Sequence, residues 1–138
     1  LSFLTEKSAI FVTNAVAHAK PLAAAGFRVY LVGGELKGST EAVVGNQALM
    51  NLQSYHFTKG FFGTNGISRQ SGLTTPDMNE AMVKKTAMGQ CRECFILADH
   101  SKFGNVSSVT FGAFQSGTIL TDGCPEEYKS SGNVVICG

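Results

Sequence analysis

Short apolar runs of strand length, separated by segments with helical spacing, are the feature that most limits how this chain can fold. Several runs are apolar throughout, as expected for strands whose two faces are both covered by helices. Strands that alternate with helices in this way form largely parallel sheets. The sequence therefore predicts an α/β fold with flanking helices and with strands at 9–13, 27–32, 58–63, 94–98, 117–121 and 134–136.

Three segments between these runs are expected to form helices, namely 15–25, 44–52 and 76–88. The first is rich in alanine and ends at Gly26, although Pro21 must either start its regular part or kink it. The other two carry apolar residues at helical spacing, so we expect each to bury one side.

Composition and charge narrow the class of protein. With 138 residues, 43% of them hydrophobic, the chain has the size and apolar content of a single compact domain over 1–138. The 11 Lys and Arg residues nearly balance the 10 Asp and Glu residues, and the longest basic run is the pair Lys84 and Lys85. Binding to a phosphate backbone requires a stronger basic footprint, so the chain is not expected to hold DNA by itself.

Neither a membrane span nor a signal peptide is expected. The longest apolar stretches are of strand length, well below the ~20 residues needed to cross a bilayer. The N-terminal stretch Leu1–Lys7 lacks a starting Met and the charged-then-apolar order of a signal peptide. We therefore interpret the chain as a piece of a larger protein and expect that protein in the cytoplasm.

Four cysteines, Cys91, Cys94, Cys124 and Cys137, allow two disulfides, a metal cluster or free thiols. Cys91 and Cys94 have the spacing of redox and zinc sites. Cys124 and Cys137 stand far apart, however, and no His is placed to complete a tetrahedral set. We favour free thiols that pack as small hydrophobic side chains, and we expect neither a metal nor a cofactor.

Polar or glycine-rich loops follow the ends of the predicted strands, where open parallel sheets bind their ligands. Glycines let backbone N–H groups approach an anion, and helix N-termini add partial positive charge. Each loop alone also fits an ordinary tight turn, but together they predict one anion-tolerant crevice. The candidate binding residues are Asn14, Gly34, Thr64, Asn65, Gly66, Thr75, Asp77, Glu80, Asp99 and Lys102.

Some members of this set have competing interpretations. Lys102 is either a solvated surface lysine or a donor to a phosphate or hydroxyl, and the spacing favours neither. Asp77 and Glu80 fit, in decreasing order, helix capping, binding of hydroxyl groups and proton transfer. The helix would have Pro76 in its first turn and Thr75 as its N-cap. GxSxG, P-loop and GxGxxG patterns do not occur, so hydrolase and nucleotide-binding functions lack their usual motifs.

Five short motifs, taken in order, resemble the C-terminal sensor domain of the DeoR family of bacterial transcriptional repressors. The resemblance extends from Val12 to Asp122, and the order of the motifs makes it specific. The motifs are Leu31-Val32-Gly33-Gly34-Glu35-Leu36 with Val44-Gly45, Phe62-Gly63-Thr64-Asn65-Gly66-Ile67, Gly72-Leu73-Thr74-Thr75-Pro76-Asp77, Glu80-Ala81 with Val83-Lys84, and Leu97-Ala98-Asp99-His100-Ser101-Lys102-Phe103-Gly104.

The resemblance implies a Rossmann-like fold related to that of ribose-5-phosphate isomerase and glucosamine-6-phosphate deaminase. It also implies a phosphorylated sugar as effector, a cytoplasmic location and a homo-oligomer. Operator DNA would be bound only through an N-terminal helix-turn-helix domain that the chain lacks. A family loop of the form Asp-x-Gly-Ser/Thr-Thr, which helps to hold the phosphate, is also missing, so this piece is expected to be an incomplete sensor.

The same resemblance argues against catalysis. The isomerase turn with two aspartates corresponds to Thr64–Ile67, which has neither, and the isomerase lysine is missing from Ser68–Gly72. Acid and base for enediol chemistry are therefore absent. We predict a binding domain without catalytic residues. The alternatives are a residual sugar-phosphate isomerase or deaminase, and an oligomerisation domain whose crevice is filled.

Overall fold

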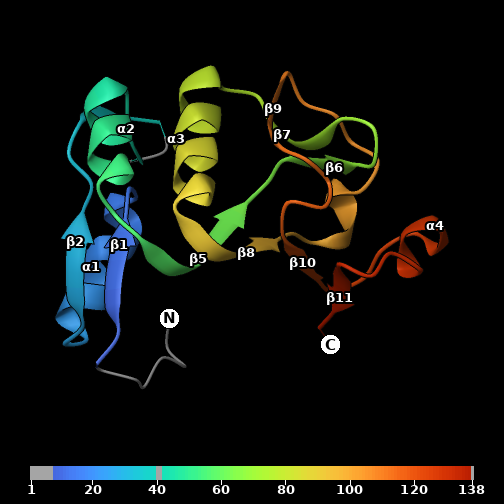
Figure 1. Ribbon diagram of the computed structural model, residues 1–138, viewed down its shortest axis with the longest axis horizontal. Coiled ribbons are helices and arrows are strands. Elements are labelled where there is room, and N and C mark those ends of the chain that lie inside the picture. Colours follow the sequence, from blue (N-terminus) through green and yellow to red (C-terminus); the bar gives the residue numbers. More distant parts are fainter. Residues whose placement is uncertain (1–7, 40–41, 138) are drawn as a thin grey trace. The chain divides into compact units, whose positions relative to one another are not determined.

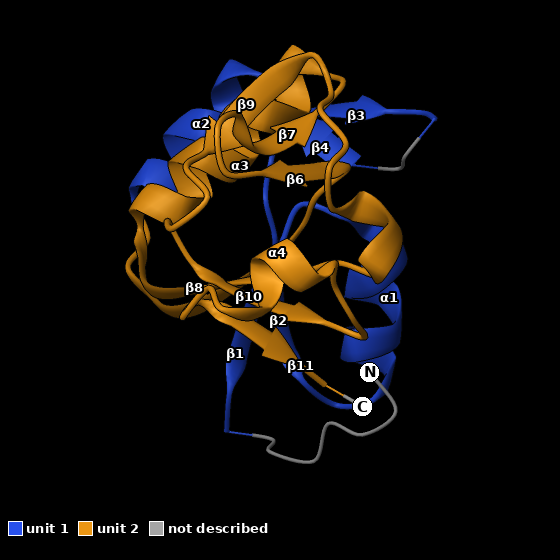
Figure 2. Cartoon of the chain, turned by 90° about the vertical axis from the view of Figure 1, so that its right-hand side faces the viewer, with its two compact units in different colours: residues 1–54 blue, residues 55–138 orange. Residues whose placement is uncertain are grey.

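The computed structural model describes residues 8–39 and 42–137, which form two compact units. Unit 1 comprises residues 1–54 and unit 2 comprises residues 55–138 (Figure 2). The stretch Leu1–Lys7, from which we inferred the absence of a signal peptide, lies outside the described residues. Each unit has its own strands and its own buried side chains.

Unit 1 is built on two parallel strands, β1 (Ile10–Thr13) and β2 (Arg28–Leu31), which are joined by helix α1 (Val16–Ala24). All three elements match the predicted segments to within one residue at each end. Pro21 lies inside α1, five residues after its start, so the interpretation of Pro21 as the start of the helix is wrong. Leu22 of the same helix is buried.

A hairpin and a second helix complete unit 1. Strands β3 (Glu35–Lys37) and β4 (Ala42–Val44) pair in antiparallel fashion, and helix α2 (Asn46–Gln53) follows. The predicted helix 44–52 therefore begins two residues too early. Val44 is the buried last residue of β4, and Gly45 separates the strand from the helix with a φ of 97°, a value that favours glycine.

Unit 2 contains a four-stranded parallel sheet, which confirms the predicted α/β class (Figure 1). Its spatial order is β11-β10-β8-β5. Each strand overlaps a predicted run, but β8 begins three residues before the predicted strand 94–98. Helix α3 (Met78–Gly89) contacts both β5 and β8. The strands are β5 (Phe57–Gly63), β8 (Cys91–Leu97), β10 (Thr118–Thr121) and β11 (Val134–Ile136), and a short helix α4 (Glu126–Lys129) precedes β11.

A small antiparallel sheet lies within the segments that we expected to be loops of unit 2. Its strands are β6 (Gly66–Ser68), β7 (Gly72–Thr75) and β9 (Val109–Gly112). Strands of three or four residues rich in glycine and threonine are too short to show an alternating pattern. Ile67 and Leu73 from this sheet are fully buried in one core cluster with Ile96 and Ile119 of the parallel sheet, so the two sheets of unit 2 are packed together.

The start of α3 differs from the expectation. Asp77 is the N-cap, and its Oδ2 accepts a hydrogen bond from the backbone N–H of Glu80 at 2.9 Å. Thr75 is instead the last residue of β7 and is fully buried, and Pro76 precedes the N-cap. The assignment of Thr75 as N-cap is therefore wrong, because pairing with β9 holds it in the sheet. The first interpretation of Asp77, helix capping, is confirmed.

Candidate functional site

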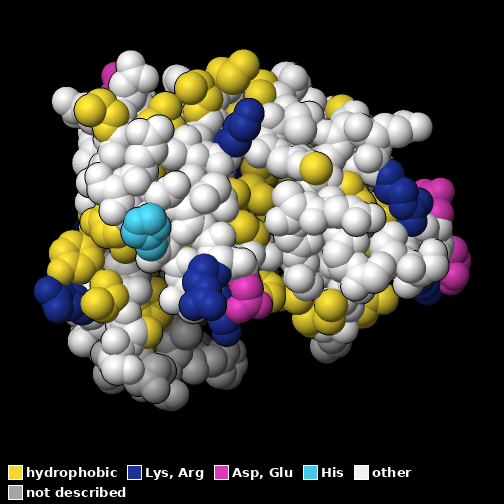
Figure 3. Space-filling model, in the orientation of Figure 1, with side chains coloured by type: hydrophobic (Ala, Val, Ile, Leu, Met, Phe, Trp, Pro, Cys, Tyr) yellow, Lys and Arg dark blue, Asp and Glu magenta, His cyan; other side chains and the backbone are white. Residues whose placement is uncertain are grey.

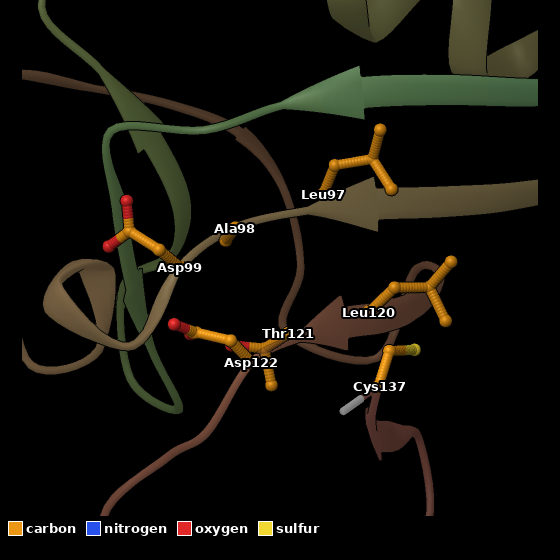
Figure 4. A pocket seen from close by; sticks show the side chains of 7 residues that line it. All are labelled: Leu97, Ala98, Asp99, Leu120, Thr121, Asp122 and Cys137. Atoms are coloured by element: carbon orange, nitrogen blue, oxygen red, sulfur yellow. The ribbon is translucent and has the colours of Figure 1, made fainter. Parts of the chain in front are cut away.

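The carboxyl ends of β8, β10 and β11 surround an open hollow of about 490 Å³. Leu97 and Leu120, which are partners in the register of β8 and β10, line it from the strands, and Asp99 and Asp122 line it from the loops beyond the strands (Figure 4). Open parallel sheets bind ligands at such strand ends. The complete lining is Leu97, Ala98, Asp99, Leu120, Thr121, Asp122 and Cys137.

Asp99 precedes a single turn of 3-10 helix, η1 (His100–Lys102), and caps it. Its Oδ1 accepts hydrogen bonds from the hydroxyl of Ser101 and, at 2.9 Å, from the backbone N–H of Ser101. The hydroxyl bond is the main cause that holds the pKa of the exposed Asp99 carboxyl below its ordinary value. A carboxylate has about four acceptor sites, so Asp99 keeps capacity for a further donor.

Asp122 joins the loop after β10 to the loop after β8. The backbone N–H of His100 donates to its Oδ1 at 2.8 Å, and the His100 ring Nδ1 lies 3.2 Å from its Oδ2. The ring contact is the main cause that lowers the pKa of the Asp122 carboxyl. The side chains of His100 and Asp122 are both exposed. With Asp99, the rim of the hollow therefore carries two carboxylates that are ionised at neutral pH and held in place by hydrogen bonds.

Lys102 is half-buried at the end of η1 and is not among the residues that line the hollow. Its backbone N–H donates to the carbonyl of Asp99 at 3.2 Å. Its charge also contributes to the lowered pKa of Asp99. Lys102 therefore acts on the Asp99 carboxylate through its charge, from the same turn of helix.

The hydroxyl groups in the segment after β5 form hydrogen bonds within that segment. The Thr64 hydroxyl is buried and lies 2.9 Å from the carbonyl oxygen of Gly66 and 3.1 Å from that of Thr74, so it donates to one of them at a time. The buried Thr75 hydroxyl donates to Oδ1 of Asn65 at 3.0 Å. Asn65 itself is exposed, so of these side chains it is the one that solvent reaches most freely.

Gly66 allows this loop to contact the segment after η1. A β-carbon at Gly66 would lie 2.3 Å from the carbonyl oxygen of Asn105 and 2.6 Å from Oγ1 of Thr74. Next to it, the backbone N–H of Gly104 donates to the carbonyl of Ile67 at 2.8 Å. The absence of a side chain at Gly66 thus brings the loops after β5 and β8 together.

Lys84 is a cation near the strand ends that the candidate set did not include. Its Nζ donates to the carbonyl of Gly63, at the carboxyl end of β5, at 2.7 Å and lies 5.0 Å from the centre of the Phe111 ring. Burial lowers the pKa of Lys84, and the charge of Glu80, one helical turn earlier, acts in the opposite direction. The i, i+4 spacing of Glu80 and Lys84 is the sequence signal that identifies this pair.

In unit 1, Asn14 and Gly34 hold the hairpin in place. The Asn14 side-chain amide donates to the carbonyl of Val43 at 3.2 Å, and the Asn14 carbonyl accepts from the Val43 N–H at 2.7 Å. Gly34 has a φ of 146°, and a β-carbon there would lie 2.9 Å from Val43 Cγ1 and from the carbonyl oxygen of Val44. Both residues therefore have a structural role within unit 1.

The other candidates lie in unit 2, in three local groups. Thr64, Asn65, Gly66 and Thr75 share one hydrogen-bonded loop region, while Asp77 and Glu80 share the start of α3. Asp99 and Lys102 flank η1. Sequence reasoning missed Asp122, although it directly follows a predicted strand, the same signal that selected Asp99.

Cysteines and acidic residues form no metal cluster within residues 8–39 and 42–137: no three or more His, Cys, Asp or Glu side chains are suitably grouped there. The four cysteines are free thiols. Cys91, Cys94 and Cys124 are half-buried and Cys137 is exposed, so the expectation that they pack as small hydrophobic side chains is wrong for Cys137. The Cys91 thiol donates to the carbonyl of Ala87 at 3.1 Å, and burial is the main cause that raises its pKa to about 11. A thiol with this pKa is a poor nucleophile and metal ligand at neutral pH.

Surface charge is sparse on the face shown in Figure 3, where Lys and Arg side chains stand apart from one another. No helix among the described residues has the length and apolar character needed to span a membrane.

The fold is that of an α/β domain with a hollow at the place where such sheets bind small molecules. The family model of the DeoR C-terminal sensor domain matches residues 2–123, and the chain belongs to this family. It is 39% identical over 120 residues to the uncharacterized HTH-type transcriptional regulator FruR of Bacillus subtilis, covering 87% of this chain and 48% of that protein.

Two further relatives come from other organisms. The chain is 33% identical over 103 residues to the lactose phosphotransferase system repressor of Streptococcus mutans, covering 75% of this chain and 41% of the repressor. It is 35% identical over 116 residues to the HTH-type transcriptional regulator GlpR of Haloferax volcanii, covering 80% of this chain and 46% of that protein. The chain thus spans slightly less than half the length of these curated relatives.

Proposed function

We propose that this chain is the effector-binding part of a transcriptional repressor of sugar metabolism, and that its effector is a phosphorylated sugar. The observation that carries the proposal is the capped turn Asp99–Lys102 at the carboxyl end of β8, where the Asp99 carboxylate is exposed and the charge of Lys102 contributes to its lowered pKa. A carboxylate accepts hydrogen bonds from sugar hydroxyls, and an ammonium attracts a phosphate. The names of the relatives, which are transcriptional regulators and sugar-transport repressors, support the same function.

The residues of the proposed site are the candidate set, and they differ in how far their side chains are accessible to a ligand. Asn65, Asp99 and Lys102 offer their side chains to the effector, because each is exposed or half-buried at a strand end. Asp77 and Glu80 orient it from the start of α3. Thr64, Gly66 and Thr75 shape the loop, and Asn14 and Gly34 shape the hairpin of unit 1.

The partners belong to the same proposal. Operator DNA is bound through a helix-turn-helix domain outside this chain, in a cytoplasmic homo-oligomer. The 138 residues form one sensor domain that comprises both units. The effector acts by binding one state of the oligomer more tightly than the other, which shifts the population between DNA-bound and released forms.

We further propose that the domain binds its effector without turnover. The loop after β5 carries Thr64 and Asn65 where an enzyme of this fold needs carboxylates, and the Thr64 hydroxyl is committed to backbone carbonyls. Incubation with ribose 5-phosphate and glucosamine 6-phosphate is expected to leave both compounds unchanged. Formation of an isomerised or deaminated product would establish the enzymatic alternative.

A thermal-shift experiment on the full-length protein tests the binding proposal. Ribose 5-phosphate, fructose 6-phosphate and glucosamine 6-phosphate are added separately, and at 100 times the Kd an effector stabilises the native state by about 2.7 kcal/mol. Lys102→Ala is expected to abolish the shift at the same concentration. Lys129→Ala, which removes an exposed lysine paired with Glu126 on α4, is the matched control and should keep it. Unchanged melting with all three compounds would reject the proposed effector class.

A further inference from the structure

The hollow at the ends of β8, β10 and β11 has a lining that suits the sugar of a sugar phosphate but not its phosphate group. Among its seven lining residues, two are carboxylates and none is a cation. A phosphate placed there would face the negative charges of Asp99 and Asp122, and like charges repel even near a protein surface. The hollow is therefore unsuited to the phosphate group.

Neutral hydroxyl groups, in contrast, find acceptors on both loops. The Asp122 carboxylate is fixed by the backbone N–H and ring of His100, and the Asp99 carboxylate by Ser101. Each carboxylate retains lone pairs for additional donors. Acceptors that are already held in place lose little conformational entropy when they bind a ligand.

The strand ends supply an apolar surface on one side of these acceptors. Leu97 is 48% exposed, although it lies next to its register partner Leu120 in the middle of a parallel sheet. In Figure 4 the two leucine side chains and that of Cys137 lie at the strand ends, with the two carboxylates beyond them on the loops. An apolar surface next to hydroxyl acceptors is complementary to a sugar ring, which presents C–H groups on one side and hydroxyls at its edge.

We infer that this hollow holds the ring and hydroxyl groups of the effector, with Asp122 as a specificity-determining acceptor, and that the phosphate lies outside it on the side of Lys102. The inference rests on the proposed function and deepens it. It assigns Asp122, which belongs to no motif of the predicted site, a direct contact with the sugar. It also assigns the two ends of the ligand to separate groups of residues.

Isothermal titration of the full-length protein with four probes tests this assignment. The probes are ribose 5-phosphate, fructose 6-phosphate, glucosamine 6-phosphate and inorganic phosphate. Asp122→Asn is expected to weaken the tightest sugar phosphate at least tenfold and to leave inorganic phosphate unchanged or slightly tighter. Lys102→Ala is expected to weaken both. Glu126→Gln, which changes an exposed carboxylate of α4 outside the hollow, should alter neither.

A second variant separates the sugar surface from any effect of Asp122 on the loops. Leu97→Ser keeps both carboxylates and removes the exposed apolar surface, and it is expected to weaken the sugar phosphate three- to tenfold without affecting inorganic phosphate. Two outcomes overturn this inference and leave the proposed function standing. One is sugar-phosphate binding that is unchanged in both variants. The other is a loss of inorganic phosphate binding equal to the loss of sugar-phosphate binding. Absence of sugar-phosphate binding by the wild-type protein overturns the proposed function and this inference together.

Discussion

The loops after β5 and β8 leave neighbouring parallel strands, whose ends are paired at Gly63 and Leu97, yet they have opposite characters. Between β5 and α3, the hydroxyls of Thr64 and of Thr75, the last residue of β7, are buried and bonded within the same segment. After β8, the carboxylate of Asp99 is exposed and Lys102 stands beside it. Motif residues at the strand ends thus divide into those that build the loop and those that are available to a ligand.

The physical origin of the difference lies in the path of the chain after each strand. The chain after β5 turns back as the β6–β7 hairpin and enters the core through Ile67 and Leu73. A buried hydroxyl must find a partner inside the protein, because an unsatisfied one is costly. The chain after β8 forms one exposed turn, η1, whose polar side chains are solvated and need no such partner.

The largest effect expected from this comparison is on folding, at Gly66. In Gly66→Ala the new β-carbon would collide with the Asn105 carbonyl, a backbone atom that cannot move aside freely. The free energy of unfolding should fall by about 2–4 kcal/mol, as measured by urea denaturation followed by circular dichroism. Gly63→Ala is the control because nothing lies within 4 Å of its β-carbon position. Equal losses in the two variants would refute the proposed close approach.

Thr64→Val should destabilise the fold by about 1–2 kcal/mol, because valine keeps the shape of the side chain but removes the donor to the Gly66 and Thr74 carbonyls. Thr58→Val, at an exposed position of β5, is the matched control and should change the urea midpoint little. The structural role of Thr64 is supported if Thr64→Val lowers stability while the effector affinity of the folded protein is retained. A selective loss of affinity with no loss of stability would place Thr64 among the ligand contacts instead.

Asp99→Asn should show the converse behaviour. Loss of an ionised acceptor on the β8 loop is expected to weaken sugar-phosphate binding about tenfold in a calorimetric titration. The urea midpoint should stay near that of the wild type, since Asp99 is exposed. If Asp99→Asn instead lowers the urea midpoint and binds the sugar phosphate normally, the distinction between the two loops is wrong.

The smallest expected effect concerns pH. The pKa values of Asp99 and Asp122 are lowered in the folded protein, so both side chains favour folding above the unfolded carboxyl pKa of about 3.9. That contribution is lost as the pH falls through the lower folded values. Carbon-detected NMR titration should give midpoints below about 3.9 for both residues. In His100→Ala the midpoint of Asp122 should rise toward this unfolded value while that of Asp99 changes less, and equal shifts would show that His100 is not the specific partner of Asp122.

Much of the fold can be predicted from short stretches of sequence. The parallel strands were identified because each is a short apolar run, which is a local property of the sequence. The ends of α1 and α3 were located to within two residues for the same reason. The motif series likewise identified the family, because each motif is contiguous in the chain. The expectation that both faces of the parallel strands are covered is wrong for the described residues, because Phe61 of β5 and Leu97 of β8 are exposed.

Tertiary structure decided which polar residues are available. Nothing local distinguishes Thr64 from Asp99 as a strand-end polar residue, but packing of the β6–β7 hairpin buries one and leaves the other in solvent. Asp122 gained its place beside the hollow through a contact with His100, 22 residues away. Short stretches of sequence determined the strands, the helices and the family of this protein. Hydrogen bonds between distant segments determined which side chains remain free to meet a ligand. Burial and long-range contacts form only in the folded chain, so no single stretch of sequence reveals them.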